Sequence, residues 1–98
     1  MCKSELYRQI LNTVSQETEI SCNELLSTSR RAEVVDARCV LVYFLSEQGL
    51  NTAEIASRIN RSQQAVRRLK NLYTVRARQR GNLIARNSNI IRKLLENI

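Results

Sequence analysis

Apolar residues recur at helical spacing along the first third of this chain. The repeating positions are Leu6, Ile10, Leu11 and Val14. Their separations of three or four predict an amphipathic helix over residues 3–15. A short second helix is expected over residues 22–28, because Ser21 precedes it as a capping residue and Glu24 stands at its third position.

The next apolar segment, residues 39–45, is an uninterrupted run that fits either a buried strand or a buried helix. A helix is favoured because the run continues a helical pattern from upstream, and because Gly49 follows where a helix would end. The sequence therefore predicts a helix over roughly residues 30–48, with Thr28 or Ser29 at its start. This helix would be central to the fold and buried on most sides.

A close pair of helices is expected next. Asn51 can cap a short helix, and Glu54 at its third position can answer the cap. Asn60 tolerates the left-handed backbone that would end this helix, and Ser62 can cap a second, longer one. A short helix, a tight turn and a longer helix over residues 51–73 are the pattern of a helix-turn-helix.

A last helix is expected over residues 82–97, after the preceding helix has run to about Arg80. Its apolar stripe would pack on the domain's own core or form a homodimer. The chain has no Pro and only two Gly, which favours helices throughout. We therefore predict one domain over residues 1–98, an all-α, compact bundle of five or six helices containing a helix-turn-helix.

Charge is distributed unevenly along the chain, whose net charge is +7. Residues 55–95 contain eleven basic residues and no acidic one, whereas residues 1–54 contain five basic and eight acidic residues. A solvated surface kept for solubility is one explanation, but such surfaces usually mix both signs. Cationic crowding of this kind favours a nucleic-acid partner. RNA is the weaker alternative, because single-strand readers expose aromatic residues and this chain has only four.

Composition argues against an enzyme and against a metal site. There is no His to act as a base near neutral pH, and the three cysteines include no CxxC pair. We expect Cys22 and Cys39 to be small apolar residues in a reducing compartment, and we expect no cofactor. No apolar stretch is long enough to span a membrane, and the N-terminus lacks a signal peptide's apolar core, so a cytoplasmic location is expected.

The longer helix of the predicted helix-turn-helix, starting at Ser62, would present its polar side to the major groove of DNA. Gln pairs bidentately with adenine and Arg with guanine, so Gln63, Gln64 and Arg67 are candidates for base reading. The DNA-contacting residues predicted from the helix-turn-helix are Asn51, Thr52, Arg61, Ser62, Gln63, Gln64, Arg67, Arg68 and Lys70.

Segments 29–38, 49–56 and 61–66 together resemble the C-terminal duplex-binding domain of the bacterial replication initiator DnaA. The resemblance implies a stand-alone relative of that domain. The wider superfamily includes the Trp repressor. The resemblance covers about residues 28–73.

The resemblance implies further DNA contacts outside the helix-turn-helix. Arg38 stands at the position of a long-helix arginine that reaches the minor groove, and Arg30 and Arg31 match basic residues that contact phosphates. An alternative for Arg38 is an ion pair with Asp36, Glu33 or another carboxylate.

The sequence departs from the family where bases would be read. The family has Asp-His-Thr-Thr-Val at the start of the second helix, and this chain has Ser-Gln-Gln-Ala-Val over residues 62–66. The resemblance therefore implies duplex binding but not the initiator's own recognition sequence. No GxxxxGK[ST] is present, so ATP binding is not implied. A non-sequence-specific accessory subunit in packaging or transposition, and a helical protein-interaction module, are the alternative functions.

Overall fold

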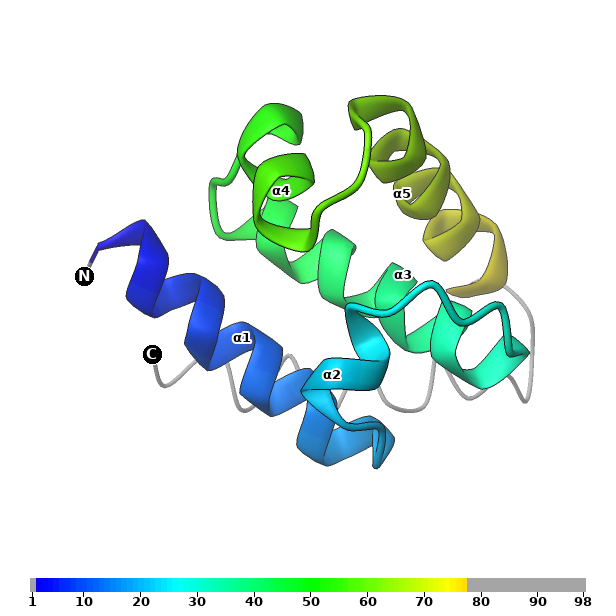
Figure 1. Cartoon of the computed structure of the whole chain (residues 1–98). Coiled ribbons are helices and arrows are strands. Elements are labelled where there is room, and N and C mark those ends of the chain that lie inside the picture. Colours follow the sequence, from blue (N-terminus) through cyan, green and yellow to red (C-terminus); the bar gives the residue numbers. More distant parts are fainter. Residues whose placement is uncertain (1, 78–98) are drawn as a thin grey trace.

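The third helix lies at the centre of the molecule. The computed structural model describes residues 2–77 and contains α1 (Lys3–Thr18), α2 (Cys22–Leu25), α3 (Ala32–Glu47), α4 (Thr52–Ile59) and α5 (Gln63–Ala77). In Figure 1, α1 and α2 lie on one side of α3, and α4 and α5 lie on the other. All four contact α3. Five helices without a strand among these residues confirm the predicted all-α class.

The apolar run at residues 39–45 is helical, as predicted, and forms the middle of α3. The side chains of Cys39, Leu41, Val42 and Leu45 are fully buried. A helix that is apolar on nearly every side needs neighbours all round it, and α3 has them. The core therefore surrounds α3, and the other helices are positioned by packing against it.

The ends of the first two helices differ from the prediction. α1 continues to Thr18 and ends where Glu19 adopts a left-handed conformation, with φ 59°. α2 stops at Leu25, although its predicted cap is present, with the Glu24 amide donating to Ser21 Oγ at 3.2 Å. α2 is short because the Ser27 amide and hydroxyl both donate to the Glu24 carbonyl oxygen and close the chain into a turn.

The predicted start of the central helix at Thr28 or Ser29 is wrong. α3 begins at Ala32, and its cap residue, Arg31, makes no side-chain capping bond. The Ser29 hydroxyl instead accepts from the Arg31 amide at 3.4 Å, a local turn that competes with helix. Residues 26–31 therefore form a loop between α2 and α3, which we call the α2–α3 loop.

The predicted helix over residues 82–97 and the homodimer through it lie outside the described residues, as does the predicted extension of α5 to Arg80. Among the described helices, none combines the length and apolar character needed to cross a membrane.

Candidate nucleic-acid interface

The first helix of the pair, α4, begins with the predicted capping box. The Glu54 amide donates to Asn51 Oδ1 at 2.8 Å, and the Asn51 amide donates to Glu54 Oε1 at 3.2 Å. The side-chain oxygen of Asn51 is thus committed to the cap. Asn51 is exposed and Thr52 is half-buried. Both predicted contact residues therefore lie at the N-terminal end of α4, where they reach the protein surface.

A tight turn follows α4. Asn60 adopts the predicted left-handed conformation, with φ 56° and ψ 51°. The Arg61 amide donates back to the Ala56 carbonyl at 3.0 Å, which fixes the direction in which the chain leaves the helix. The Ala65 amide donates to Ser62 Oγ at 3.1 Å, so Ser62 caps α5 as predicted. The helix-turn-helix predicted over residues 51–73 is therefore present.

One side of α5 is fixed to the core. Val66 is fully buried and Tyr73 is 5% exposed, while Leu69 and Leu72 are packed against the same cluster. The ring of Tyr73 stacks on that of Tyr43 in α3, with centroids 3.9 Å apart. Tyr43 and Tyr73 are thus packing residues. This apolar side holds α5 against α3 and fixes which side chains face outward.

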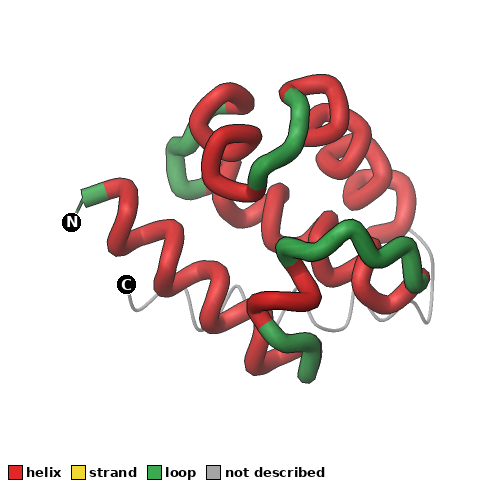
Figure 2. Tube along the Cα trace, in the orientation of Figure 1, coloured by secondary structure: helices red, strands yellow, loops and turns green. Residues whose placement is uncertain are grey.

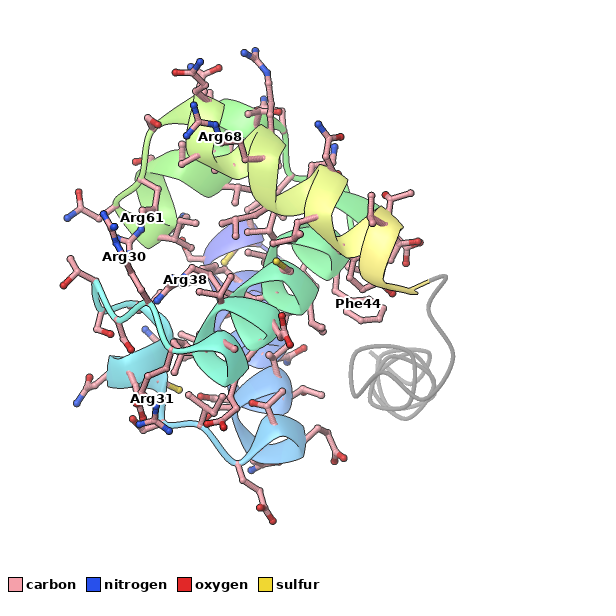
Figure 3. The ribbon with its side chains drawn as sticks, turned by 90° about the vertical axis from the view of Figure 1, so that its right-hand side faces the viewer. Arg30, Arg31, Arg38, Phe44, Arg61 and Arg68 are labelled. Carbon is pink, nitrogen blue, oxygen red and sulfur yellow. The ribbon has the colours of Figure 1, made fainter. Side chains whose placement is uncertain are left out.

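The opposite side of α5 is polar, basic and exposed. The exposed residues of this side are Ser62, Gln63, Gln64, Arg67 and Arg68. Lys70 is half-buried. Figure 3 places Arg68 at the outer edge of the helix. This surface, which we call the α5 outer face, begins at the capped end of the helix.

The sequence interpretation missed one residue of the α5 outer face. Asn71 is exposed and follows Gln64 by seven positions and Arg67 by four, so the three side chains share one stripe of the helix. The same helical spacing, applied outward from the apolar positions, is the signal that could have found it. Its amide group can pair bidentately with adenine in the way a Gln can.

The α2–α3 loop carries two neighbouring arginines that differ in their surroundings. The Arg31 guanidinium pairs with Glu24 at 2.9 Å and with Glu33 at 3.0 Å, and the bonds to Glu33 and Glu24 raise its pKa. Arg30 is exposed, and within residues 2–77 the structure gives it no ion pair. Of the two predicted phosphate contacts, only Arg30 has a charge without a carboxylate partner in this part of the chain.

Arg38 points inward, from α3 toward the α2–α3 loop. Its side chain is only 7% exposed, and its guanidinium donates to three carbonyl oxygens, those of Leu25, Ser27 and Ser29. Burial lowers its pKa, and the nearby positive charge of Arg61 lowers it further. Carbonyls rather than carboxylates are its partners among the described residues. Minor-groove contact by Arg38 stays a prediction.

Arg61, in the turn of the helix-turn-helix, bonds to the same loop. Its Nη2 donates to the Ser27 carbonyl oxygen, and its Nη1 donates to the Asn60 carbonyl at 3.2 Å. Figure 2 shows the turn and the α2–α3 loop as neighbouring segments. Figure 3 shows Arg30, Arg38 and Arg61 gathered on one side of the molecule, with Arg31 set apart from them.

The start of α1 holds α4 from the other side. Lys3 pairs with Glu54 at 2.7 Å, and Arg58 donates to the Ser4 hydroxyl at 2.6 Å. The Tyr7 hydroxyl donates to the Arg58 carbonyl at 3.4 Å, and the Arg58 guanidinium lies 5.8 Å from the centre of the Tyr7 ring. Burial raises the pKa of Tyr7. These polar contacts link the start of α1 to α4, while packing on the core positions the helix-turn-helix.

Cys22 and Cys39 contribute packing. Cys39 is fully buried in α3, and Cys22 is half-buried with its thiol 3.6 Å from Asn12 Oδ1. In the part of the chain that the structure describes, no three His, Cys, Asp or Glu side chains are grouped so as to hold a metal ion.

A capped short helix, a left-handed turn, and a second helix with one apolar and one basic side define a helix-turn-helix protein of the DNA-binding class. The family model described as the bacterial DnaA protein helix-turn-helix matches residues 7–68, and the chain belongs to this family. The resemblance noted in the sequence is thereby confirmed. Comparison with curated proteins and with solved structures found no match.

Proposed function

We propose that this protein binds double-stranded DNA sequence-specifically, with the first turns of α5 in the major groove. The observation that carries the proposal is the α5 outer face, where Gln64, Arg67 and their neighbours are exposed at the capped end of a helix whose other side is fixed to the core. In proteins of this class, side chains at the start of the second helix reach base edges.

The contacts divide into two kinds. Gln63, Gln64 and Arg67 carry groups that can pair bidentately with adenine or guanine, and each such pair discriminates by about 1–3 kcal/mol against the wrong base. The remaining predicted contacts supply position and affinity through phosphates. These are Arg30, Arg31, Asn51, Thr52, Arg61, Ser62, Arg68 and Lys70, and the family resemblance adds Arg38 as a minor-groove contact.

Electrostatics supply much of the affinity in this proposal. Residues 55–77 contain six basic and no acidic side chains. When such side chains neutralise phosphates, the DNA releases its bound counterions, so the affinity falls steeply as the salt concentration rises. The proposed role is binding without a catalytic step, and a cytoplasmic location stays a prediction.

The test is selection from a pool of random-sequence duplexes by gel shift across a salt series, followed by sequencing of the bound fraction. The full chain and its Gln64→Ala, Arg67→Ala double variant are run side by side. Enrichment of a short motif by the full chain, lost in the variant, supports the proposal. Salt-sensitive binding without a motif overturns sequence specificity and favours a packaging or transposition accessory.

A pool of random-sequence single-stranded RNA and a low-salt lane complete the test. Absence of duplex binding at low salt overturns DNA binding and makes a protein-interaction module the better explanation. Tighter binding to the single-stranded RNA pool would replace DNA with RNA as the partner.

A further inference from the structure

We propose that Arg38 is a positioning residue that holds the α2–α3 loop in shape, so that Arg30 is presented to a DNA phosphate. The inference rests on the proposed function and deepens it, because it gives the buried arginine a task that does not require the side chain to touch DNA. The family resemblance implied a direct contact instead.

All three nitrogens of the Arg38 guanidinium donate to the loop backbone. Its Nε donates to the Leu25 carbonyl at 2.8 Å and its Nη2 to the Ser27 carbonyl at 2.8 Å. Both terminal nitrogens reach the Ser29 carbonyl, at 3.3 and 3.4 Å. One planar group thus bridges three carbonyls spread over five consecutive residues.

The Ser29 carbonyl connects this bridge directly to Arg30. That carbonyl and the amide nitrogen of Arg30 belong to one planar peptide group. By fixing this plane, Arg38 fixes the backbone from which the Arg30 side chain leaves. Arg30 itself is exposed, so its position depends on the loop rather than on contacts of its own head group.

The turn of the helix-turn-helix holds the same loop from the opposite side. Arg61 donates to the Ser27 carbonyl, the atom that also accepts from Arg38. The loop is therefore tied both to α3 and to the start of α5. A phosphate contact made by Arg30 would then be kept in register with the bases that α5 reads.

Only an arginine can make this bridge. A lysine carries the same charge, but as a single point on a flexible stem, so it cannot reach three carbonyls in one plane. Arg38→Lys therefore keeps the charge and loses the geometry. It separates a positioning role from a direct electrostatic contact with DNA.

The experiment is a double-mutant cycle on binding to a fluorescent 30-base-pair duplex of mixed sequence in 0.1 M salt. The proteins are the full chain, Arg30→Ala, Arg38→Lys and the double variant. We expect each single change to weaken binding about threefold to tenfold, the scale of one phosphate contact. We expect the double variant to be little weaker than either single one, because both remove the same contact.

Independent losses that multiply in the double variant would overturn the inference, as would Arg38→Lys binding as tightly as the full chain. Full-chain binding is the reference, so its absence overturns the proposed function together with this inference. Weaker DNA binding by the Arg38→Lys variant, with normal binding by the full chain, is distinct from a failure of the full chain to bind DNA.

Thermal unfolding of each variant checks that it is folded at the assay temperature. Should Arg38→Lys be unfolded, Ser29→Gly takes its place in the cycle. This change removes the hydroxyl that accepts from Arg31 and loosens the loop, while Arg38 is unchanged. Non-additive losses with Arg30→Ala support the inference, and additive losses or none overturn it.

Discussion

Arg30 and Arg31 are neighbours in the α2–α3 loop, and only Arg31 is paired with carboxylates among the described residues. Its two partners, Glu24 and Glu33, come from the helices on either side of the loop. Arg30 is exposed without an ion pair in the same part of the chain. These two adjacent arginines can therefore be compared directly. Arg31 links the two helices that flank the loop, and Arg30 is available to a phosphate.

Arg30→Ala is expected to weaken duplex binding more than Arg31→Ala. A lost phosphate contact makes the negative slope of log affinity against log salt shallower by about 0.9. The Arg31 change removes a charge that is already partly balanced by Glu24 and Glu33. Fluorescence anisotropy with a mixed-sequence duplex between 50 and 300 mM salt, about the range over which such contacts are measured, checks both slopes. Equal slopes would show that the ion pairs do not separate the two roles.

Local signals were sufficient to predict the helix-turn-helix. The capping oxygens of Asn51 and Ser62, and the left-handed backbone of Asn60, act within four residues of their own position. Their effect can therefore be inferred from the sequence around them. The apolar spacing that places Val66 and Tyr73 against α3 is of the same local kind.

The α2–α3 loop could not be predicted in this way. Its shape depends on bonds from Arg38 and Arg61, which are 11 and 34 residues away from Ser27. Good helix formers follow Ser29 in this region, so a longer helix was expected. The local turns at Ser27 and Ser29 interrupt the helix, and the long-range donors then hold the loop by satisfying its carbonyls. Arg30 and Arg31, predicted to lie at the start of the helix, therefore lie in the loop instead.

Gln64→Ala is expected to relax sequence preference more than it weakens overall binding. Gln64 is exposed on the α5 outer face, where a bidentate pair with adenine would discriminate by about 1–3 kcal/mol. Selection from random duplexes before and after the change measures the information lost at each base position. Gln16→Ala, an exposed glutamine on α1, is the matched control and should leave the motif unchanged. An equal loss of affinity on every sequence would mean that Gln64 contacts the DNA phosphates instead of a base.

Asn60→Ala is expected to destabilise the fold by about 1 kcal/mol, because alanine resists the left-handed conformation that this position requires. Asn60→Gly should be close to neutral, since glycine adopts it freely. Thermal unfolding followed by circular dichroism distinguishes the two. Similar melting temperatures for the alanine and glycine variants would mean that the turn relaxes to another conformation without cost.

The contact between α1 and α4 predicts a specific loss of stability in acid. The side-chain bond from Lys3, and then the backbone bond from Asn51, lower the pKa of Glu54 below its ordinary value. A carboxylate with a lowered folded-state pKa stabilises the fold fully above its unfolded pKa, about 4.3, and that contribution disappears as the pH falls through the folded value.

Glu54→Gln should therefore lower the free energy of unfolding at pH 7 and have little effect once the pH is below both pKa values. Urea unfolding of the unchanged chain and of this variant at a series of pH values from about 7 to 3 measures the difference. Lys3→Gln is the control for the ion pair, and it should remove part of the same pH dependence because the largest cause of the shift is lost. A difference in stability between the unchanged chain and the Glu54→Gln variant that is constant across this range would contradict the assignment, since an interaction with the charged carboxylate must vanish when the carboxylate is protonated.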